Sequence, residues 1–183
     1  SSNGCTDTSQ QVIVVYPEPI FTFQTNPDSG CSPLKVVFPS AIGAVDYKWY
    51  FGDGDSAKGS TPTHVYSNST TNSLNFTTTL IAKSSFGCSD TNTGSIIVHP
   101  SPSAAISVSD SINCQPHSLN ISNNSTGAYR YHWDFGNGDT SDTNASLFPY
   151  AYTHNNPTST NFKLQLVVET QNGCFDTSFK IIK

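Results

Sequence analysis

Cysteine is the residue type whose number and spacing most clearly predict chemistry in this chain of 183 residues. The five cysteines are Cys5, Cys31, Cys88, Cys114 and Cys174. No two of them have the spacing of about two to four residues that is typical of structural zinc sites, which favours disulfides over a metal site. Disulfides persist only in oxidising compartments, so we expect an extracellular location. The alternative is five free buried thiols in a cytosolic protein.

The histidines do not form a familiar catalytic arrangement. They are His64, His99, His117, His132 and His154, and no acid and nucleophile recur beside them. The sequence also lacks Gly-x-Ser-x-Gly, His-Glu-x-x-His, a P-loop and the Rossmann glycine pattern. We therefore predict that the protein is not an enzyme.

The composition excludes several classes of partner. Only 11% of the residues are charged, and eight Lys and Arg against thirteen Asp and Glu give a net charge of −5. Without a basic cluster, the chain is not expected to bind nucleic acid or an anionic membrane. Its apolar runs are too short to insert into a bilayer. No signal peptide is recognisable, so we expect a mature segment or a piece of a longer protein.

The positioning of the cysteines follows from an internal repeat. Cys5 and Cys88 are 83 residues apart, and Cys31 and Cys114 are separated by the same interval. The segment Tyr47–Gly54 recurs as Tyr131–Gly138, and Pro17-Glu18-Pro19 recurs as Pro100-Ser101-Pro102. The repeat predicts two full domains, 17–99 (repeat 1) and 100–183 (repeat 2). Residues 1–16 are predicted to be the terminal strand of a preceding repeat, in a slice of a longer array.

Apolar residues alternate with polar ones within each repeat. Tyr47, Trp49 and Phe51 share one face of an expected strand, and the segment from Phe162 to Val168 alternates in the same way. Such alternation is typical of half-buried strands in a sheet with one wet face. Gly, Pro, Asn and Asp interrupt the sequence at intervals that suit six or seven strands per repeat. We therefore predict an all-β fold of two tandem β-sandwiches.

The aromatic strand and the turn after it resemble the Trp-x-Phe-Gly-Asp-Gly signature of PKD (polycystic kidney disease) domains. The matching segments are Trp49–Gly54 and Trp133–Gly138, and Pro62–Tyr66 is similar to a second family motif that is degraded in repeat 2. The resemblance implies immunoglobulin-like β-sandwiches in tandem on extracellular proteins. The cysteine pair further resembles a variant found in large bacterial surface adhesins.

The signature residues are expected to be structural. They are Trp49, Phe51, Gly52, Asp53 and Gly54 in repeat 1, and Trp133, Phe135, Gly136, Asn137 and Gly138 in repeat 2. We expect both tryptophans to be buried in the core. The glycines permit a positive φ in the turn, and Asp53 or Asn137 can accept a hydrogen bond from the turn backbone. The alternative is an exposed aromatic platform for sugar rings, with Tyr50 and Tyr150 as candidates.

Confinement of each cysteine pair to one repeat predicts the disulfides Cys31–Cys88 and Cys114–Cys174. The two separations, 57 and 60 residues, are nearly equal. In the chain-entropy model each bond contributes about 4 kcal/mol. Cys5 is left without an assigned partner.

Calcium remains open as a cofactor, although no cofactor is expected. Some PKD-like domains bind calcium through an Asp-rich loop ahead of the tryptophan strand, but residues 40–45 and 123–128 contain no carboxylate. Calcium prefers several charged oxygen ligands. The remaining candidates are Asp53 and Asp55, then Asp139 and Asp142, for which solvated turns are the alternative.

Two functions fit this sequence. The first is a non-catalytic spacer or stalk segment of a large secreted or cell-surface adhesin, whose partners are the neighbouring repeats of the same polypeptide. Proline-rich junctions such as Pro100-Ser101-Pro102 favour extended linkers between repeats. The second is an accessory module of a secreted hydrolase that binds an extracellular polysaccharide or protein. A binding module needs outward-facing aromatic residues in a row, and Asp134 in repeat 2 replaces Tyr50 of repeat 1, which favours the spacer.

Overall fold

The structure is a computed structural model that describes residues 4, 6–20, 25–155 and 158–183. These residues form 14 strands, and none of them forms a helix that is long and apolar enough to cross a membrane. The strands are β1 (Ser29–Cys31), β2 (Leu34–Val37), β3 (Ala44–Tyr50), β4 (Ser56–Lys58), β5 (Thr63–Tyr66), β6 (Leu74–Ser84), β7 (Ser89–His99), β8 (Ile106–Val108), β9 (His117–Asn123), β10 (Arg130–Asp134), β11 (Thr140–Ser141), β12 (Leu147–Tyr152), β13 (Phe162–Glu169) and β14 (Phe175–Ile182).

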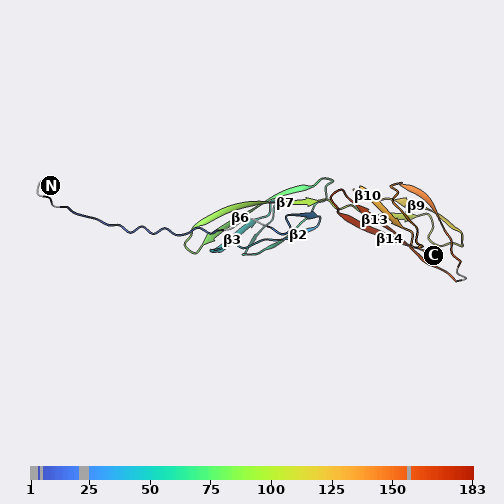
Figure 1. Ribbon diagram of the computed structural model, residues 1–183, viewed down its shortest axis with the longest axis horizontal. Coiled ribbons are helices and arrows are strands. Elements are labelled where there is room, and N and C mark those ends of the chain that lie inside the picture. The colour runs from blue at the N-terminus through green and yellow to red at the C-terminus, as the bar shows by residue number, and fades with distance from the viewer. Residues whose placement is uncertain (1–3, 5, 21–24, 156–157) are drawn as a thin grey trace. The chain divides into compact units, whose positions relative to one another are not determined.

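The first seven strands form two sheets (Figure 1). One sheet has the order β1-β7-β6-β3-β4, and the other pairs β2 with β5. The short edge strand β1 runs parallel to β7, with Cys31 opposite His99. This register places Cys31 beside the last residue of β7, where the chain leaves repeat 1.

The last seven strands also form two sheets, with the orders β11-β10-β13-β14 and β12-β9-β8. Buried side chains from both sheets pack into one core, among them Leu119, Ile121, Trp133, Leu164 and Leu166. Two antiparallel sheets around a shared apolar core are a β-sandwich. The predicted all-β, immunoglobulin-like sandwich fold is confirmed.

Burial alternates along the strands as the sequence pattern predicted. Along β6, Leu80 and Ala82 are buried, while Ile81 between them is partly exposed. Along β13, Leu164, Leu166 and Val168 are fully buried. These two strands therefore contribute one face to a core and leave the other face at least partly in contact with solvent.

Two compact units are distinguished by their internal contacts. One comprises residues 1–25, 37–63 and 77–94, and the other comprises 26–36, 64–76 and 95–183. These units do not follow the sequence repeat, so the boundaries 17–99 and 100–183 stay predictions. The names repeat 1 and repeat 2 refer below to those sequence segments.

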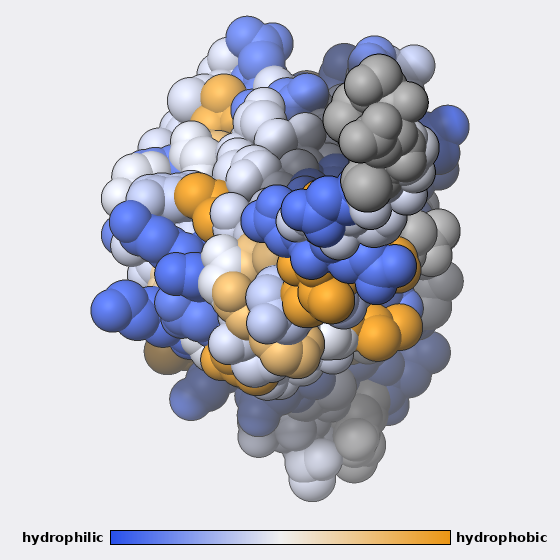
Figure 2. Space-filling view, turned by 90° about the vertical axis from the view of Figure 1, so that its left-hand side faces the viewer, coloured by the Kyte–Doolittle hydropathy of each residue, from blue (hydrophilic) through white to orange (hydrophobic). Residues whose placement is uncertain are grey.

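The segment predicted as the terminal strand of a preceding repeat forms no strand in its described residues, 4 and 6–16. Val12 and Val15 are 88% and 87% exposed. The segment touches the β6–β7 hairpin at its end, where the ring of Tyr16 stacks on Phe86 with 4.4 Å between centroids. Other hydrophobic residues also reach the surface, and on the face shown in Figure 2 they lie among hydrophilic ones.

Candidate functional site

Both signature tryptophans lie in the interior, and each donates the same kind of hydrogen bond to a backbone carbonyl. Trp49 and Trp133 have no exposed surface. The indole Nε1 of Trp49 donates to the Gly59 carbonyl at 3.1 Å, and that of Trp133 donates to the Thr143 carbonyl at 3.1 Å. A buried indole with its one donor satisfied is a packing residue and offers no platform to a ligand.

The first glycine of each signature turn is required for two reasons. Gly52 and Gly136 have positive φ values of 88° and 76°. A Cβ atom on Gly52 would lie 2.4 Å from the Thr77 carbonyl oxygen, and one on Gly136 would lie 2.7 Å from the Lys163 backbone nitrogen. Only glycine therefore fits where this turn crosses the neighbouring strand.

The polar residue of each signature turn accepts a hydrogen bond from the backbone of the same turn. The backbone N–H of Asp55 donates to Oδ1 of Asp53 at 3.1 Å, and the N–H of Asp139 donates to Oδ1 of Asn137 at 3.1 Å. This is the Asx-turn that the sequence predicted. The structural interpretation of the signature is therefore supported in both repeats.

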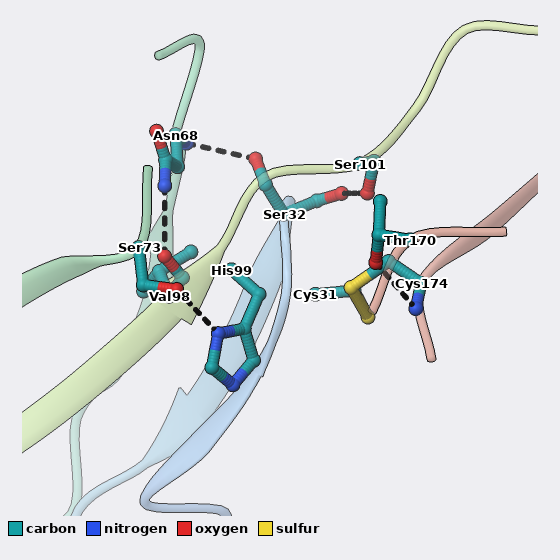
Figure 3. Close-up of a disulfide and its surroundings, with 9 residues drawn as sticks. All are labelled: Cys31, Ser32, Asn68, Ser73, Val98, His99, Ser101, Thr170 and Cys174. Carbon is teal, nitrogen blue, oxygen red and sulfur yellow. Dashed lines mark hydrogen bonds between the residues drawn. A yellow bond between two sulfur atoms is a disulfide. The ribbon is translucent and has the colours of Figure 1, made fainter. Parts of the chain in front are cut away.

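The disulfide prediction was wrong. Cys31 is bonded to Cys174, with the Cα atoms 5.6 Å apart and a sequence separation of 143 (Figure 3). Cys88 and Cys114 are free, with Cys88 partly buried and Cys114 exposed. The bond therefore joins a cysteine of repeat 1 to a cysteine of repeat 2. Cys5 lies outside the described residues.

The length of one strand explains the error in repeat 1. Cys88 comes directly before β7, while Cys31 pairs with His99 at the other end of the same strand. A strand of this length spans about 33 Å, and a disulfide requires Cα atoms within about 7 Å. The two cysteines of repeat 1 therefore lie at opposite ends of the sheet and cannot bond.

Repeat 2 places its two cysteines in the same way. Cys174 comes directly before β14, whereas Asn113, next to Cys114, donates its backbone N–H to the carbonyl of Lys183 just beyond that strand at 3.2 Å. The eight residues of β14 span roughly 25 Å. A bond between Cys114 and Cys174 is therefore excluded by the same geometry.

A polar network surrounds the disulfide on the side of repeat 1, and the sequence did not reveal it. Asn68 is 6% exposed and donates from Nδ2 to the carbonyls of Asn72 and Val98, both at 2.8 Å. Its backbone N–H donates to Oγ of Ser32 at 2.8 Å, and the hydroxyl of Ser101 donates to the Ser32 carbonyl at 2.5 Å (Figure 3). Asn68 heads an Asn-x-Thr sequon, but its buried amide serves the fold.

The candidate platform residues are only partly available to a ligand. Tyr50 is 39% exposed, and Nζ of Lys48 lies 4.9 Å from the centre of its ring. The ring of Tyr150 stacks on Phe135 with 3.9 Å between centroids. The two tyrosines therefore do not form the row of outward aromatic residues that a platform needs.

The carboxylates considered for calcium serve as hydrogen-bond acceptors in repeat 2. The hydroxyl of Tyr150 donates to Oδ2 of Asp139 at 2.5 Å and accepts from Nδ2 of Asn137 at 2.9 Å. Burial and this bond to Asp139 raise the pKa of Tyr150. Asp142 instead pairs with Nδ1 of His132 at 2.8 Å. Asp139 and Asp142 thus have separate protein partners.

A hollow on the surface of repeat 2 was not predicted from the sequence. It has a volume of about 550 Å³ and is lined by Tyr129, Arg130, Tyr131, His132, Asp142, Asn144, Val167 and Glu169. Tyr129 is 60% exposed, and the guanidinium of Arg130 lies 5.9 Å from the centre of its ring. These residues could not be recognised as a site because the repeat does not preserve them: Val45, Asp46 and Lys48 stand where repeat 2 has Tyr129, Arg130 and His132.

Two histidines each have one partner of a kind found in catalytic sites. Among the described contacts, neither histidine has both a nucleophile and a carboxylate beside it. His132 pairs with Asp142, and the residues that line the hollow around them include no serine, threonine or cysteine. Nδ1 of His99 lies 2.7 Å from the Ser73 hydroxyl, and no described hydrogen bond joins His99 to a carboxylate. Nucleophilic catalysis needs a nucleophile, a base and a group that orients the base.

Residues 21–98 match the family described as "PKD domain", so the PKD resemblance is confirmed for this segment. The match covers the signature turn of repeat 1 and does not extend into repeat 2. None of the curated proteins is similar enough in sequence to count as a relative.

Solved structures similar to this chain include two single PKD domains. The PKD1 domain of the Vibrio cholerae metalloprotease PrtV is 26% identical, with a TM-score of 0.35, and the match covers 45% of this chain and 95% of that one. The PKD1 domain of Vibrio anguillarum Epp is 22% identical, with a TM-score of 0.34, and the match covers 44% and 89%. Murine CEACAM1b is 12% identical, with a TM-score of 0.38, and the match covers 88% and 97%.

Proposed function

We propose that this chain is a non-catalytic spacer segment of a large, repeat-containing extracellular adhesin. The observation that carries the proposal is the disulfide between Cys31 and Cys174, which ties the two sequence repeats together. Such a bond requires an oxidising compartment, in agreement with a secreted or cell-surface location. Its partners are the neighbouring repeats of the same polypeptide.

The position of the bond suits a segment that carries load. The 143-residue separation between Cys31 and Cys174 includes both signature strands. If the chain is pulled from its ends, these residues cannot add to its length while the bond is intact. Fully extended, they correspond to roughly 500 Å. The bond therefore limits how far a mechanical load can lengthen the segment.

Stretching single molecules in the oxidised and reduced states tests the proposal. We expect the oxidised chain to lengthen only by residues outside the bond. After reduction, unfolding should release a further length of roughly 500 Å. A chain that lengthens equally in both states would contradict the spacer function.

The hollow on repeat 2 favours a second candidate function, an accessory module that binds a polysaccharide or protein for a secreted hydrolase. Exposed aromatic rings bordered by hydrogen-bonding groups suit sugars, and the hollow combines Tyr129 with Arg130 and Asn144. Retention on insoluble cellulose, chitin or collagen that is lost with Tyr129→Ala would support this candidate. Tyr50→Ala, which removes another partly exposed tyrosine, is the matched control. Absence of retention would favour the spacer.

A further inference from the structure

The two free cysteines occupy the same places in the fold as the two bonded ones. We call the end of a repeat where the polypeptide enters its incoming end, and the end where it leaves its outgoing end. Cys31 lies at the outgoing end of repeat 1, beside His99, and Cys174 lies at the incoming end of repeat 2. The observed bond therefore runs from the outgoing end of one repeat to the incoming end of the next.

Cys114 lies at the outgoing end of repeat 2, in surroundings that match those of Cys31. Three residues before Cys31, the Asp28 carbonyl accepts from the backbone N–H of Ile97 at 2.9 Å. Three residues before Cys114, the Ser111 carbonyl accepts from the N–H of Lys183 at 2.7 Å. The equivalence therefore includes the hydrogen bonds that hold each cysteine segment against the last strand.

A second pair of hydrogen bonds repeats on the other side of these cysteines. Ser32 accepts from the backbone N–H of Asn68 at 2.8 Å, and Gln115 accepts from the N–H of His154 at 3.0 Å. Each acceptor directly follows its cysteine in the sequence. Cys114 is thus held as Cys31 is, but its thiol is exposed and unbonded.

Cys88 lies at the incoming end of repeat 1, in the β6–β7 turn, which is equivalent to the β13–β14 turn that contains Cys174. The Cys88 carbonyl accepts from the N–H of Ser84 at 2.8 Å, and the Cys174 carbonyl accepts from the N–H of Thr170 at 2.8 Å. The Cys88 thiol also contacts the carbonyl of Tyr16 at 3.8 Å, on the segment that leads into repeat 1. Cys88 therefore lies beside the incoming chain, where Cys174 meets its partner.

We propose that Cys88 and Cys114 each form a disulfide with a neighbouring repeat of the same kind. Cys88 bonds to the outgoing-end cysteine of the repeat before it, and Cys114 bonds to the incoming-end cysteine of the repeat after it. In each step two thiols lose two protons and two electrons to a disulfide oxidant, which is reduced to two thiols. The inference rests on the proposed spacer function, since it requires further repeats. It places a disulfide cross-link at every junction between repeats of the array.

A second copy of this chain provides the test, because its Cys88 is an incoming-end cysteine and its Cys114 an outgoing-end cysteine. The whole chain is prepared with Cys5→Ser, and then with either Cys88→Ser or Cys114→Ser added. The two variants are reduced, mixed and oxidised with a glutathione redox buffer. Non-reducing electrophoresis and mass spectrometry of linked peptides identify the bonds that form.

We expect the mixture to give a dimer joined from Cys114 of one variant to Cys88 of the other. This linkage should exceed Cys88–Cys88 and Cys114–Cys114 linkages by ~5-fold or more, because docking of matching ends raises the effective concentration of the two thiols. The chain that retains both cysteines should form a ladder of longer oligomers. A decoy with Cys88→Ser, Cys114→Ser and Thr140→Cys, an exposed site on strand β11, should link ~5-fold less well.

Linkage in random proportions, or no linkage while Cys31–Cys174 forms completely, would overturn the proposal. Its failure differs from failure of the spacer function. If the thiols do not link and the oxidised chain still resists stretching, only the disulfide proposal is wrong. If they link and the chain binds a polysaccharide through Tyr129, the spacer function is wrong and the disulfide proposal holds.

Discussion

Repeat 1 carries Lys48 opposite Lys58 on neighbouring strands, whereas repeat 2 carries His132 beside Asp142 at the equivalent positions. The inner face shows no such change, since Trp49 and Trp133 make the same hydrogen bond to a backbone carbonyl. Like charges on exposed strands are mildly unfavourable, and an exposed polar side-chain pair contributes little. The outer face can therefore vary at low cost, while the interior and the ends of the repeats are constrained by packing and by the cysteines.

The largest expected difference between equivalent positions is at the cysteines. We expect Cys31→Ser to lower the free energy of unfolding by about 5 kcal/mol, from the entropy of the loop that the bond closes. Cys114→Ser should change it by less than about 0.5 kcal/mol, because Cys114 is exposed and unbonded in this chain. Denaturant unfolding of the two variants, each in a Cys5→Ser background, measures the contrast.

Equal losses for Cys31→Ser and Cys114→Ser would contradict the observed pairing. They are the outcome expected if each repeat enclosed its own disulfide. Adding a reductant to the parent chain should reproduce the Cys31→Ser effect and leave Cys31→Ser itself unchanged.

The tryptophans should show the opposite behaviour, an equal effect in both repeats. We expect Trp49→Ala and Trp133→Ala each to cost about 3–5 kcal/mol, since both indoles are fully buried. Each substitution should unfold mainly its own repeat, so circular dichroism should show an early thermal transition, while the fluorescence of the remaining indole, which lies in the other repeat, should keep the parental melting temperature. A variant that melts like the parent but loses binding to a ligand would contradict the packing role.

The interior was predictable from the sequence because its signals are local. Alternation placed Trp49 and Trp133 in the core, and the Gly-Asp-Gly pattern predicted the turn and its Asx hydrogen bond. The disulfide pairing was not predictable in this way. It depends on which end of a strand each cysteine occupies, and that follows from the parallel pairing of β1 with β7, which sequence separation does not reveal. The hollow around Tyr129 was missed because Tyr129, Arg130 and His132 occur in one repeat only.

Two glycines of the same turn should differ in how much their substitution by alanine lowers the free energy of unfolding, with effects of intermediate size. Gly52→Ala should cost more than about 2 kcal/mol, because the added Cβ meets the Thr77 backbone and the residue has a positive φ. Gly54→Ala meets no atom within 4 Å and should cost only about 1 kcal/mol for its positive φ. Gly136→Ala and Gly138→Ala should show the same order in repeat 2, as measured by denaturant unfolding. A larger loss at Gly54 than at Gly52 would contradict the role of the close strand crossing.

The smallest expected effects concern Tyr150 and Tyr152, which lie two residues apart on β12 of repeat 2. At neutral pH, Tyr150→Phe should cost about 1 kcal/mol, because the hydroxyl loses its bonds to Asn137 and Asp139. Tyr152→Phe should cost less than about 0.5 kcal/mol, because its buried hydroxyl has no hydrogen-bond partner among the described residues.

At alkaline pH, both tyrosines should contribute to the pH dependence of the free energy of unfolding. Burial is the main cause that raises the pKa of each above the ordinary value of 10.0. The unfolded chain therefore loses these protons first as the pH rises, and the stability that is fully present below about pH 10 falls above it. Substituting both tyrosines by phenylalanine should flatten this fall for repeat 2, as followed by the fluorescence of Trp133 in a Trp49→Phe background. An unchanged slope would show that other groups cause the alkaline unfolding, and that burial of these two hydroxyls does not govern the pH dependence of repeat 2.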